Sequence, residues 1–249
     1  MFSSNKIILE AKNISKYFGT ITALENVNLS VREGECLGVV GDNGAGKSTL
    51  MKVLSGLYKP SKGELFFNGN KEVLDSPRDS QNLGLEMVYQ DLALAGNLPI
   101  GENIFLGREP TKNLGFLKIL DYKKIKEMSE AHLDKLKIHV KSAEQKVEEL
   151  SGGQRQAIAI ARATAFNSKI VIMDEPTAAL AIKEVGKVLD LINSLKKMGV
   201  RVIIISHRMD DIFAVCDRVM ALFQGTNFAE SELSKTTRDE VIGWIMGKK

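Results

Sequence analysis

The residues Gly41-Asp42-Asn43-Gly44-Ala45-Gly46-Lys47-Ser48 match the pattern Gly-x-x-x-x-Gly-Lys-Ser/Thr in full. The apolar stretch Cys36–Val40 precedes this loop, and a helical pattern, Lys47–Gly56, begins inside it. A loop in this context binds polyphosphate, because glycines let backbone N–H groups turn toward the phosphates and the helix N-terminus favours anions. Taken alone, the motif predicts nucleotide binding and nothing narrower.

Two side chains of the loop carry its specific chemistry. Lys47 is expected to reach the β- and γ-phosphates as a point charge, and the Ser48 hydroxyl is a hard oxygen ligand suited to Mg²⁺. The nucleotide-binding residues predicted in this segment are Gly41, Asp42, Asn43, Gly44, Ala45, Gly46, Lys47, Ser48 and Thr49.

A second apolar stretch, Ile170–Met173, ends in the adjacent carboxylates Asp174 and Glu175. Neighbouring residues of a strand point to opposite sides, so the two carboxylates can serve different purposes. We expect Asp174 to join the Mg²⁺ shell and Glu175 to orient or deprotonate the attacking water. Two solvated acids at a strand end are the alternative, which the phosphate-binding loop upstream disfavours.

The pentapeptide Leu150-Ser151-Gly152-Gly153-Gln154 indicates a second anion site. Ser151 is a typical N-cap residue before a long helix, and the two glycines expose backbone N–H groups there. Because the chain already has one complete phosphate loop, a second cradle suggests a nucleotide held from two sides. A helix cap with no ligand is the alternative.

Short β-rich runs alternate with helical periods along the chain, which is typical of an α/β fold. Nearly continuous apolar runs predict strands of a mainly parallel sheet, and alternating runs predict an antiparallel β layer. The predicted parallel strands are Cys36–Val40, Ile170–Met173, Val202–Ser206 and Val219–Phe223. The predicted antiparallel strands are Ile7–Ile14, Leu24–Val31, Glu64–Asn68 and Leu85–Tyr89. The predicted helices are Lys47–Gly56, Gly152–Phe166 and Ile182–Met198.

The stretch from Pro99 to Val147 differs in character, because Asp121–Lys141 is rich in Lys and Glu and has apolar residues at helical spacing. We therefore expect a single domain in which residues 1–98 and 148–249 form the nucleotide-binding core with the antiparallel layer, and residues 99–147 form an inserted helical lobe. His132 and His139 fall in this lobe, where we expect surface or hydrogen-bonded histidines rather than metal ligands.

The 249 residues suit one sizeable domain, or one core with a smaller lobe. The net charge of +3 is slight and dispersed, so no nucleic-acid partner is expected. No apolar run approaches the ~20 residues needed to span a bilayer, and the first residues lack the apolar core of a signal peptide. We therefore expect a cytoplasmic protein in which Cys36 and Cys216 are reduced, partly buried thiols.

With these motifs in place, the chain resembles the ATP-binding cassette (ABC) ATPase family over essentially its whole length. Residues 150–154 match that family's signature, and they lie between the phosphate-binding loop (P-loop) and the Asp174-Glu175 strand in the expected order. The resemblance implies a P-loop NTPase core with ATP and Mg²⁺ as cofactors. It also implies that Gln90 contacts Mg²⁺ and signals to a membrane subunit, and that His207 binds the γ-phosphate.

The resemblance further implies how the nucleotide is held. Phe18 occupies the position of the aromatic residue that stacks on adenine, with Tyr17 as the alternative. In that family two cassettes pair head to tail, and each ATP lies between the P-loop of one and the signature of the other. The signature residues Ser151, Gly152, Gly153 and Gln154 would therefore bind nucleotide in trans.

A finer resemblance is to monosaccharide-importer ATPases. It rests on Val88-Tyr89-Gln90-Asp91-Leu92-Ala93-Leu94, on Glu102-Asn103-Ile104-Phe105-Leu106-Gly107-Arg108-Glu109, and on the closing Trp244-Ile245-Met246-Gly247. It implies a peripheral subunit on the inner face of the cell membrane that serves transmembrane permease subunits and, indirectly, a sugar-binding protein. Many of those proteins carry two fused cassettes, so the partner expected for this single cassette is a second copy of itself.

Two further expectations concern partners and communication. Asp91–Arg108 follows Gln90 directly, and its Pro, Gly and Asn content predicts a mobile loop that docks on the permease. Ala181 departs from the family pattern, which usually has an Asp at this position. The carboxylate that links the two sites across the dimer is missing, which puts communication between the sites in doubt.

Rival functions fit the sequence less well. An ABC protein of translation would need two fused cassettes with a basic linker. A chromosome-maintenance or DNA-repair ABC protein would need a long heptad arm, for which the about 100 residues between Thr49 and Leu150 leave no room. Glu175 and His207 argue against a nucleotide sensor without turnover. The ATPase of an exporter, or of an importer for another small solute, is the alternative that stays open.

Overall fold

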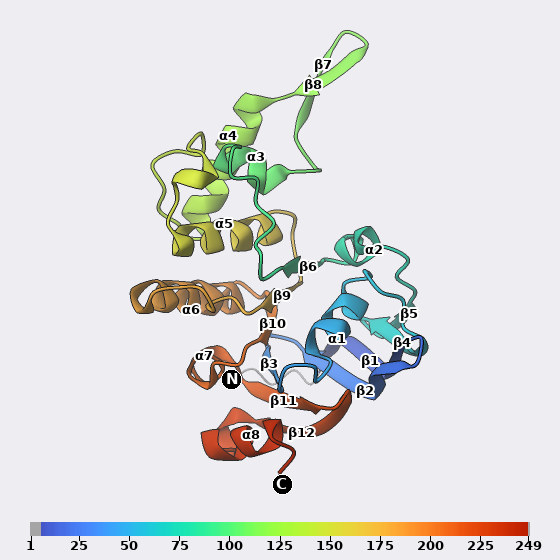
Figure 1. Ribbon diagram of the computed structural model, residues 1–249. Coiled ribbons are helices and arrows are strands. Elements are labelled where there is room, and N and C mark those ends of the chain that lie inside the picture. Colours follow the sequence, from blue (N-terminus) through green and yellow to red (C-terminus); the bar gives the residue numbers. More distant parts are fainter. Residues whose placement is uncertain (1–5, 249) are drawn as a thin grey trace.

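The computed structural model describes residues 6–248. Among these residues, the main sheet has six strands in the order β12-β11-β3-β10-β9-β6 (Figure 1). Its strands run parallel except for the edge strand β12, which pairs antiparallel with β11. The bounds are β3 Cys36–Val40, β6 Leu85–Val88, β9 Ile170–Asp174, β10 Arg201–Ile205, β11 Arg218–Phe223 and β12 Thr226–Glu232.

Strand β3 explains why the parallel strands read as continuous apolar runs. Cys36 and Val40 join the hydrophobic core on one face of the sheet, and Leu37 and Val39 join the core on the other face. A strand covered on both faces has no solvent side, so it carries no alternating polar residues. The four predicted parallel strands are confirmed, with each end within one residue of the prediction.

A second, antiparallel sheet has the strand order β2-β1-β4-β5. The apolar face of this sheet packs on helix α1, Lys47–Leu54, and on one side of the main sheet. Three of the four predicted antiparallel strands are therefore confirmed, although β1 and β2 are longer than expected. The bounds are β1 Ile7–Phe18, β2 Ile21–Arg32, β4 Lys62–Phe67 and β5 Asn70–Glu72.

The fourth prediction of an antiparallel strand, Leu85–Tyr89, is wrong. Strand β6 pairs parallel with β9 at the edge of the main sheet. Glu86 made this stretch look like a half-exposed alternating strand. In the structure Glu86 is buried, and its Oε1 accepts a hydrogen bond from Arg108 Nη2 at 2.6 Å. The polar position therefore faces a charged partner instead of water.

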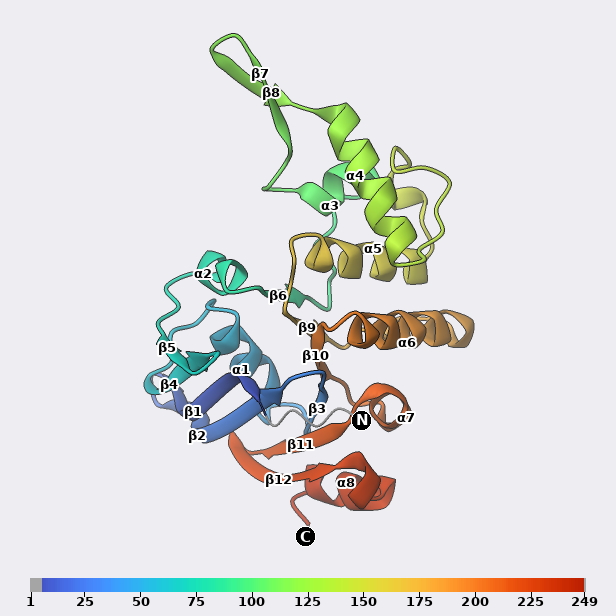
Figure 2. The ribbon, with the colours of Figure 1, turned by 180° about the vertical axis from the view of Figure 1, so that it is seen from behind.

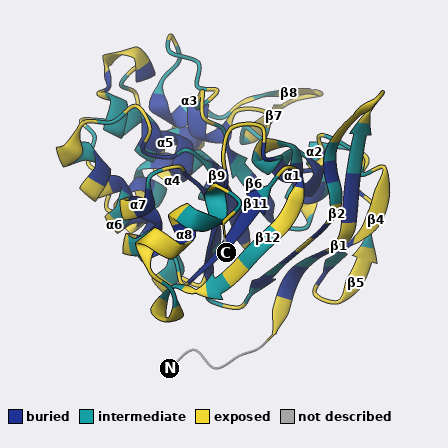
Figure 3. Cartoon of the chain, turned by 60° about the horizontal axis from the view of Figure 1, so that its bottom comes forward, coloured by how far each residue is buried: buried dark blue, intermediate teal, exposed yellow. Residues whose placement is uncertain are grey.

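The helices of the core flank the main sheet on both sides (Figure 2). The predicted helices are confirmed as α1 Lys47–Leu54, α5 Gly152–Thr164 and α6 Ile182–Lys197. Burial falls toward the edge of the sheet, where β11 is largely buried and β12 is exposed or half-buried (Figure 3). Further helices, with no counterpart in the sequence predictions, are α2 Pro77–Asn82, α7 Met209–Val215 and α8 Arg238–Ile245, with short 3₁₀ turns at Val147–Glu149 and Leu233–Lys235.

Residues 99–147 project away from the sheets (Figures 1 and 2). They contain helix α3, Ile100–Phe105, which packs against α5, and helix α4, Tyr122–Lys135. Between these helices lies a hairpin that the sequence reading did not anticipate, formed by β7, Thr111–Leu114, and β8, Leu117–Leu120. Because α3 occupies residues 100–105, the expectation of a loop throughout Asp91–Arg108 is wrong.

Three smaller expectations concern single residues and spans. His132 Nε2 lies 2.9 Å from the Ala161 carbonyl oxygen, and burial lowers the pKa of its imidazole, so it is a hydrogen-bonded histidine as expected. Cys36 and Cys216, distant in sequence, have their sulfur atoms 3.5 Å apart and are both free thiols. No helix in the described part of the chain is long and apolar enough to cross a membrane.

Candidate nucleotide-binding site

The P-loop joins the end of β3 to the start of α1 in a conformation that needs glycine. Gly41, Gly44 and Gly46 have φ values of 154°, 81° and 98°. A Cβ at Gly41 would lie 2.5 Å from the Leu222 carbonyl oxygen. A Cβ at Gly46 would lie 2.8 Å from the Ala23 carbonyl oxygen. The close approach of neighbouring strands therefore fixes the loop as a concave backbone cradle.

Lys47 places its ammonium group inside this cradle. Its Nζ donates hydrogen bonds to the carbonyl oxygens of Gly41, at 2.8 Å, and Asp42, at 2.9 Å. Burial lowers the pKa of Lys47, and the nearby carboxylates of Glu175, Asp174 and Asp42 act in the opposite direction. A cation surrounded by carboxylates and backbone carbonyls is held ready for an anionic ligand, which suits a polyphosphate.

Asp174 and Glu175 lie where β9 ends, between β10 and β6. Burial chiefly raises the pKa of Asp174, with the Glu175 charge adding to the effect and Lys47 opposing it. A bound cation would stabilise the charged form of such a carboxylate. In open parallel sheets, ligands bind at the carboxyl ends of the strands, and the P-loop and Asp174 share that edge.

Glu175 and His207 form a hydrogen-bonded pair in the site. Glu175 Oε1 lies 2.8 Å from His207 Nδ1 and also accepts a hydrogen bond from the His207 backbone N–H at 3.1 Å. The Glu175 N–H donates a hydrogen bond to the Ile205 carbonyl oxygen at 2.9 Å. The φ angle of Glu175 is 50°, and this left-handed backbone turns its side chain out of the line of the strand. Glu175 Oε2 is buried and has no protein partner among the described residues, so it can accept a hydrogen bond from a bound water.

Phe18 and Tyr17 differ in how free they are to stack on a base. Phe18 ends β1 and is 41% exposed, and its ring meets the Tyr58 ring edge to face at 5.4 Å. The Tyr17 hydroxyl donates to Glu25 Oε1 at 3.2 Å. Phe18 therefore has the more available aromatic face of the two. Gln90 lies exposed two residues after the end of β6, next to the carboxyl end of the sheet.

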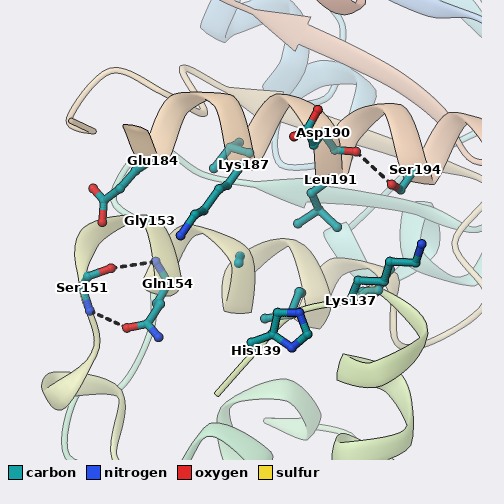
Figure 4. A pocket seen from close by; sticks show the side chains of 14 residues that line it. Lys137, His139, Ser151, Gly153, Gln154, Glu184, Lys187, Asp190, Leu191 and Ser194 are labelled. Atoms are coloured by element: carbon teal, nitrogen blue, oxygen red, sulfur yellow. Dashed lines mark hydrogen bonds between the residues drawn. The ribbon is translucent and has the colours of Figure 1, made fainter. Parts of the chain in front are cut away.

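The signature residues begin helix α5, away from the P-loop residues. Ser151 is the N-cap, with its Oγ accepting from the Gln154 N–H at 3.3 Å and its own N–H donating to Gln154 Oε1 at 3.0 Å (Figure 4). This reciprocal capping is the arrangement expected of Ser and Gln three residues apart. The loop borders a cavity of about 420 Å³ between α5, α6 and residues 136–139, which no P-loop residue lines.

Two contacts near the site were not predicted from the sequence. Arg162 on α5 donates to the carbonyl oxygens of Leu92, at 2.7 Å, and Ala93, at 2.6 Å, so the signature helix holds the segment that follows Gln90. Both contacts span about 70 residues, and no local pattern signals them. The second is Glu184 on α6, beside Gly153. Glu184 lies three residues after Ala181, which is the spacing between the N-cap and the Glu of a capping box. This spacing was the available signal in the sequence.

Comparison with known proteins places the chain in a family. The family model described as ABC transporter matches residues 24–178. The chain therefore belongs to the ABC transporter family, as an ATP-binding cassette, and the resemblance inferred from the P-loop and signature is confirmed.

Its relatives are sugar-import ATP-binding proteins by name. The xylose/arabinose import ATP-binding protein XylG of Sulfolobus acidocaldarius is 45% identical over 94% of this chain and 92% of its own length. The ribose import ATP-binding protein RbsA of Caldanaerobacter subterraneus is 40% identical over 97% of this chain. This chain covers 48% of that relative, and likewise 48% of the galactose/methyl galactoside import protein MglA 1 of Photobacterium profundum, at 38% identity. The chain thus spans about half the length of these two relatives.

Solved structures confirm the predicted fold class. The ADP conformation of an ATP-binding cassette of an ABC transporter superposes with a TM-score of 0.81 at 28% identity, covering 96% of this chain and 95% of that one. A dimeric cassette in a post-hydrolysis state bound to ADP and Pi gives a TM-score of 0.75 at 28% identity, covering 91% of this chain and 99% of that one.

Proposed function

We propose that this chain is the ATP-binding and ATP-hydrolysing subunit that powers a membrane importer of a monosaccharide. The observation that carries the ATPase part is the Glu175–His207 pair, 2.8 Å apart, with Glu175 Oε2 left open beside the Lys47 cradle. A nucleotide sensor without turnover does not need a buried carboxylate oxygen that can accept a hydrogen bond from a water. The names of the relatives support the import of a monosaccharide.

The residues around the cradle suit ATP with Mg²⁺. The nucleotide-binding residues are Phe18 for adenine and Gly41, Asp42, Asn43, Gly44, Ala45, Gly46, Lys47, Ser48 and Thr49 for the phosphates. Ser48, Gln90 and Asp174 offer the hard oxygen ligands that Mg²⁺ prefers. When bound, the cation neutralises charge on the phosphates.

The proposed roles of the other residues follow from their contacts. Glu175 accepts a hydrogen bond from the attacking water and orients or deprotonates it. His207 is held through Nδ1 by Glu175 Oε1, which leaves its other ring nitrogen to bind the γ-phosphate. Gln90 links the occupied site to the segment that Arg162 holds on the signature helix.

A second copy of the chain completes each site. Ser151, Gly152, Gly153 and Gln154 offer an N-terminal helix turn to an anion, yet they border a cavity apart from the P-loop. We infer that they bind the γ-phosphate of ATP held by the partner copy. The dimeric relative bound to ADP and Pi supports this arrangement.

The segment Asp91–Arg108 forms the proposed contact with the transmembrane permease subunits. In the same proposal residues 1–98 and 148–249 form the core, residues 99–147 form the helical lobe, and docking on the permease keeps the chain at the cytoplasmic face of a cell membrane. Within the docking segment, Glu102 is half-buried on α3 and Leu106 is 48% exposed. Arg108 is less suited to docking, because it is already paired with Glu86.

The test is sugar uptake in vesicles that contain the permease and, outside, the sugar-binding protein. ATP inside the vesicles should drive uptake with the wild-type chain and not with Glu175→Gln. Glu102→Lys should lower uptake while the chain's own ATPase rate stays unchanged. Export of the sugar, or ATP hydrolysis that never moves a monosaccharide, would contradict the proposal and favour an exporter or an importer of another solute.

A further inference from the structure

A carboxylate from helix α6 lies against the signature loop of the same chain. A Cβ at Gly153 would lie 2.8 Å from Glu184 Cβ and 3.0 Å from both Cγ and Cδ of Glu184. Residue 153 must therefore be glycine for Glu184 to keep this position. Figure 4 shows the Glu184 carboxylate projecting from α6 toward the loop that carries Ser151 and Gly153.

The carboxylate is anionic in this position. The neighbouring Ser151 hydroxyl and then the Gly153 N–H stabilise its charged form and lower the pKa of Glu184. The positive end of helix α5 acts in the same direction, because Ser151 is the N-cap and Gly153 lies in the first turn. Glu184 is therefore a resident anion beside the donors of the signature loop.

The same carboxylate also serves its own helix. Ala181 is the N-cap of α6 and provides no side-chain acceptor. Glu184 lies in the first turn of α6, and the Ala181 N–H also lowers the pKa of its carboxyl. Two helix N-termini thus converge on one carboxylate, and this explains why an ionised side chain stays at the rim of a largely apolar cavity.

Ser151 and Gly153 are also the donors that the proposed function assigns to the γ-phosphate of the partner copy. We propose that Glu184 is an internal substitute for that phosphate, which occupies the signature donors in the separate subunit and must leave them when ATP bridges two subunits. The inference rests on the proposed shared site and adds that Glu184 competes with the γ-phosphate for the donors of that site. Because two anions cannot share the same two donors, Glu184 raises the ATP concentration at which the dimer forms.

The displaced carboxylate has an alternative partner one turn further along α6. Lys187 borders the same cavity, and its charge already acts on Glu184. Residues three apart on a helix are neighbours, so a change of side-chain rotamer transfers Glu184 from the signature loop to Lys187 without moving the backbone. Glu184 is half-buried, which leaves room for this movement.

The experiment uses the full chain with Glu175→Gln, which blocks hydrolysis and lets ATP-driven dimers accumulate. Sedimentation velocity at fixed protein concentration gives the Mg-ATP concentration for half-maximal dimer. Adding Glu184→Gln keeps the shape and removes the charge, and it should lower this concentration by about tenfold, the ordinary scale of coupling between sites. Adding Lys187→Gln should raise it. Asp190→Asn, an equal loss of charge at the rim of the same cavity, is the matched control and should have no effect.

The outcomes separate this inference from the proposed function. If the Glu175→Gln chain dimerises with ATP but Glu184→Gln needs as much ATP or more, Glu184 is only a structural cap and the inference is wrong. If Glu184→Gln fails to fold, the Lys187→Gln chain provides the test. An unchanged Mg-ATP concentration for half-maximal dimer in that chain overturns the inference equally. If the Glu175→Gln chain binds ATP and stays monomeric at all concentrations, the shared site itself fails, and the inference with it.

Discussion

Reversing the charge of Arg108 should destabilise the fold as a whole. Arg108 Nη2 lies 2.6 Å from Glu86 Oε1, and the two side chains are 31% and 10% exposed. The guanidinium also lies 4.4 Å from the centre of the Phe166 ring. Arg108→Glu removes both contacts and leaves Glu86 beside a second negative charge in a largely buried position.

The magnitude follows from these contacts. Breaking a buried ion pair costs about 3–5 kcal/mol, and the partial exposure of Arg108 reduces this to about 2–3 kcal/mol. Loss of the cation–π contact adds about 0.5–1 kcal/mol. We therefore expect the free energy of unfolding to fall by about 3 kcal/mol, which moves a urea midpoint by about 1 M if the denaturant slope is about 3 kcal/mol per M.

Equilibrium urea unfolding followed by circular dichroism measures this change. Glu102→Lys, a charge reversal on α3 without a buried ion pair to break, is the matched control. It should change the free energy of unfolding by less than about 0.5 kcal/mol. The exchange Arg108→Glu with Glu86→Arg should recover part of the loss. An unchanged midpoint for Arg108→Glu would refute the reasoning and would return Arg108 to the set of free docking charges.

Three further predictions concern the nucleotide site. Lys47→Ala should weaken ATP binding by on the order of 100-fold, because two or more charged hydrogen bonds to phosphate are lost; a nucleotide titration that matches the wild type would reject the P-loop assignment. Glu175→Gln should keep ATP affinity and lower turnover by at least about 10²-fold, as measured by phosphate release; unaltered turnover would exclude a general-base role. Ala181→Asp should stabilise the fold by about 1 kcal/mol through a new N-cap on α6 and raise the Hill coefficient of ATP hydrolysis in the assembled transporter; superimposable ATPase curves would mean that the missing carboxylate has no mechanistic role.

The parts of the fold that the sequence predicted well are those fixed by local rules. The P-loop follows from three glycines and the strand before it, and α5 begins at the Ser151 cap as expected. One local signal was overlooked. Ser76 and Asp79 form a capping box around Pro77 at the start of α2, and this pattern is readable in the sequence.

The parts that failed depend on distant contacts. Strand β6 was assigned to the wrong sheet because Glu86 reads as a solvent-facing residue until Arg108, 22 residues away, is known to pair with it. The hairpin β7–β8 escaped prediction because each strand has four residues and neither packs on the core. Within the site, the sequence offered Glu175 and His207 as separate candidates, and only the fold places them 2.8 Å apart.

Ala181 connects the departure from the family pattern with the anion at the signature loop. An Asp at this position would cap α6 with its own side chain, and the N–H groups of the first turn would then have a local acceptor. With Ala181 as the N-cap, those N–H groups have no side-chain acceptor, and the carboxylate of this turn is Glu184, which lies beside Gly153 of the signature loop. The carboxylate at the start of α6 is therefore aimed at the signature loop of its own chain rather than across a dimer. In this chain, communication between two sites would begin with the release of Glu184 from Ser151 and Gly153. The Glu184→Gln and Ala181→Asp variants should accordingly act on the same step, and their effects on dimer formation should not be additive.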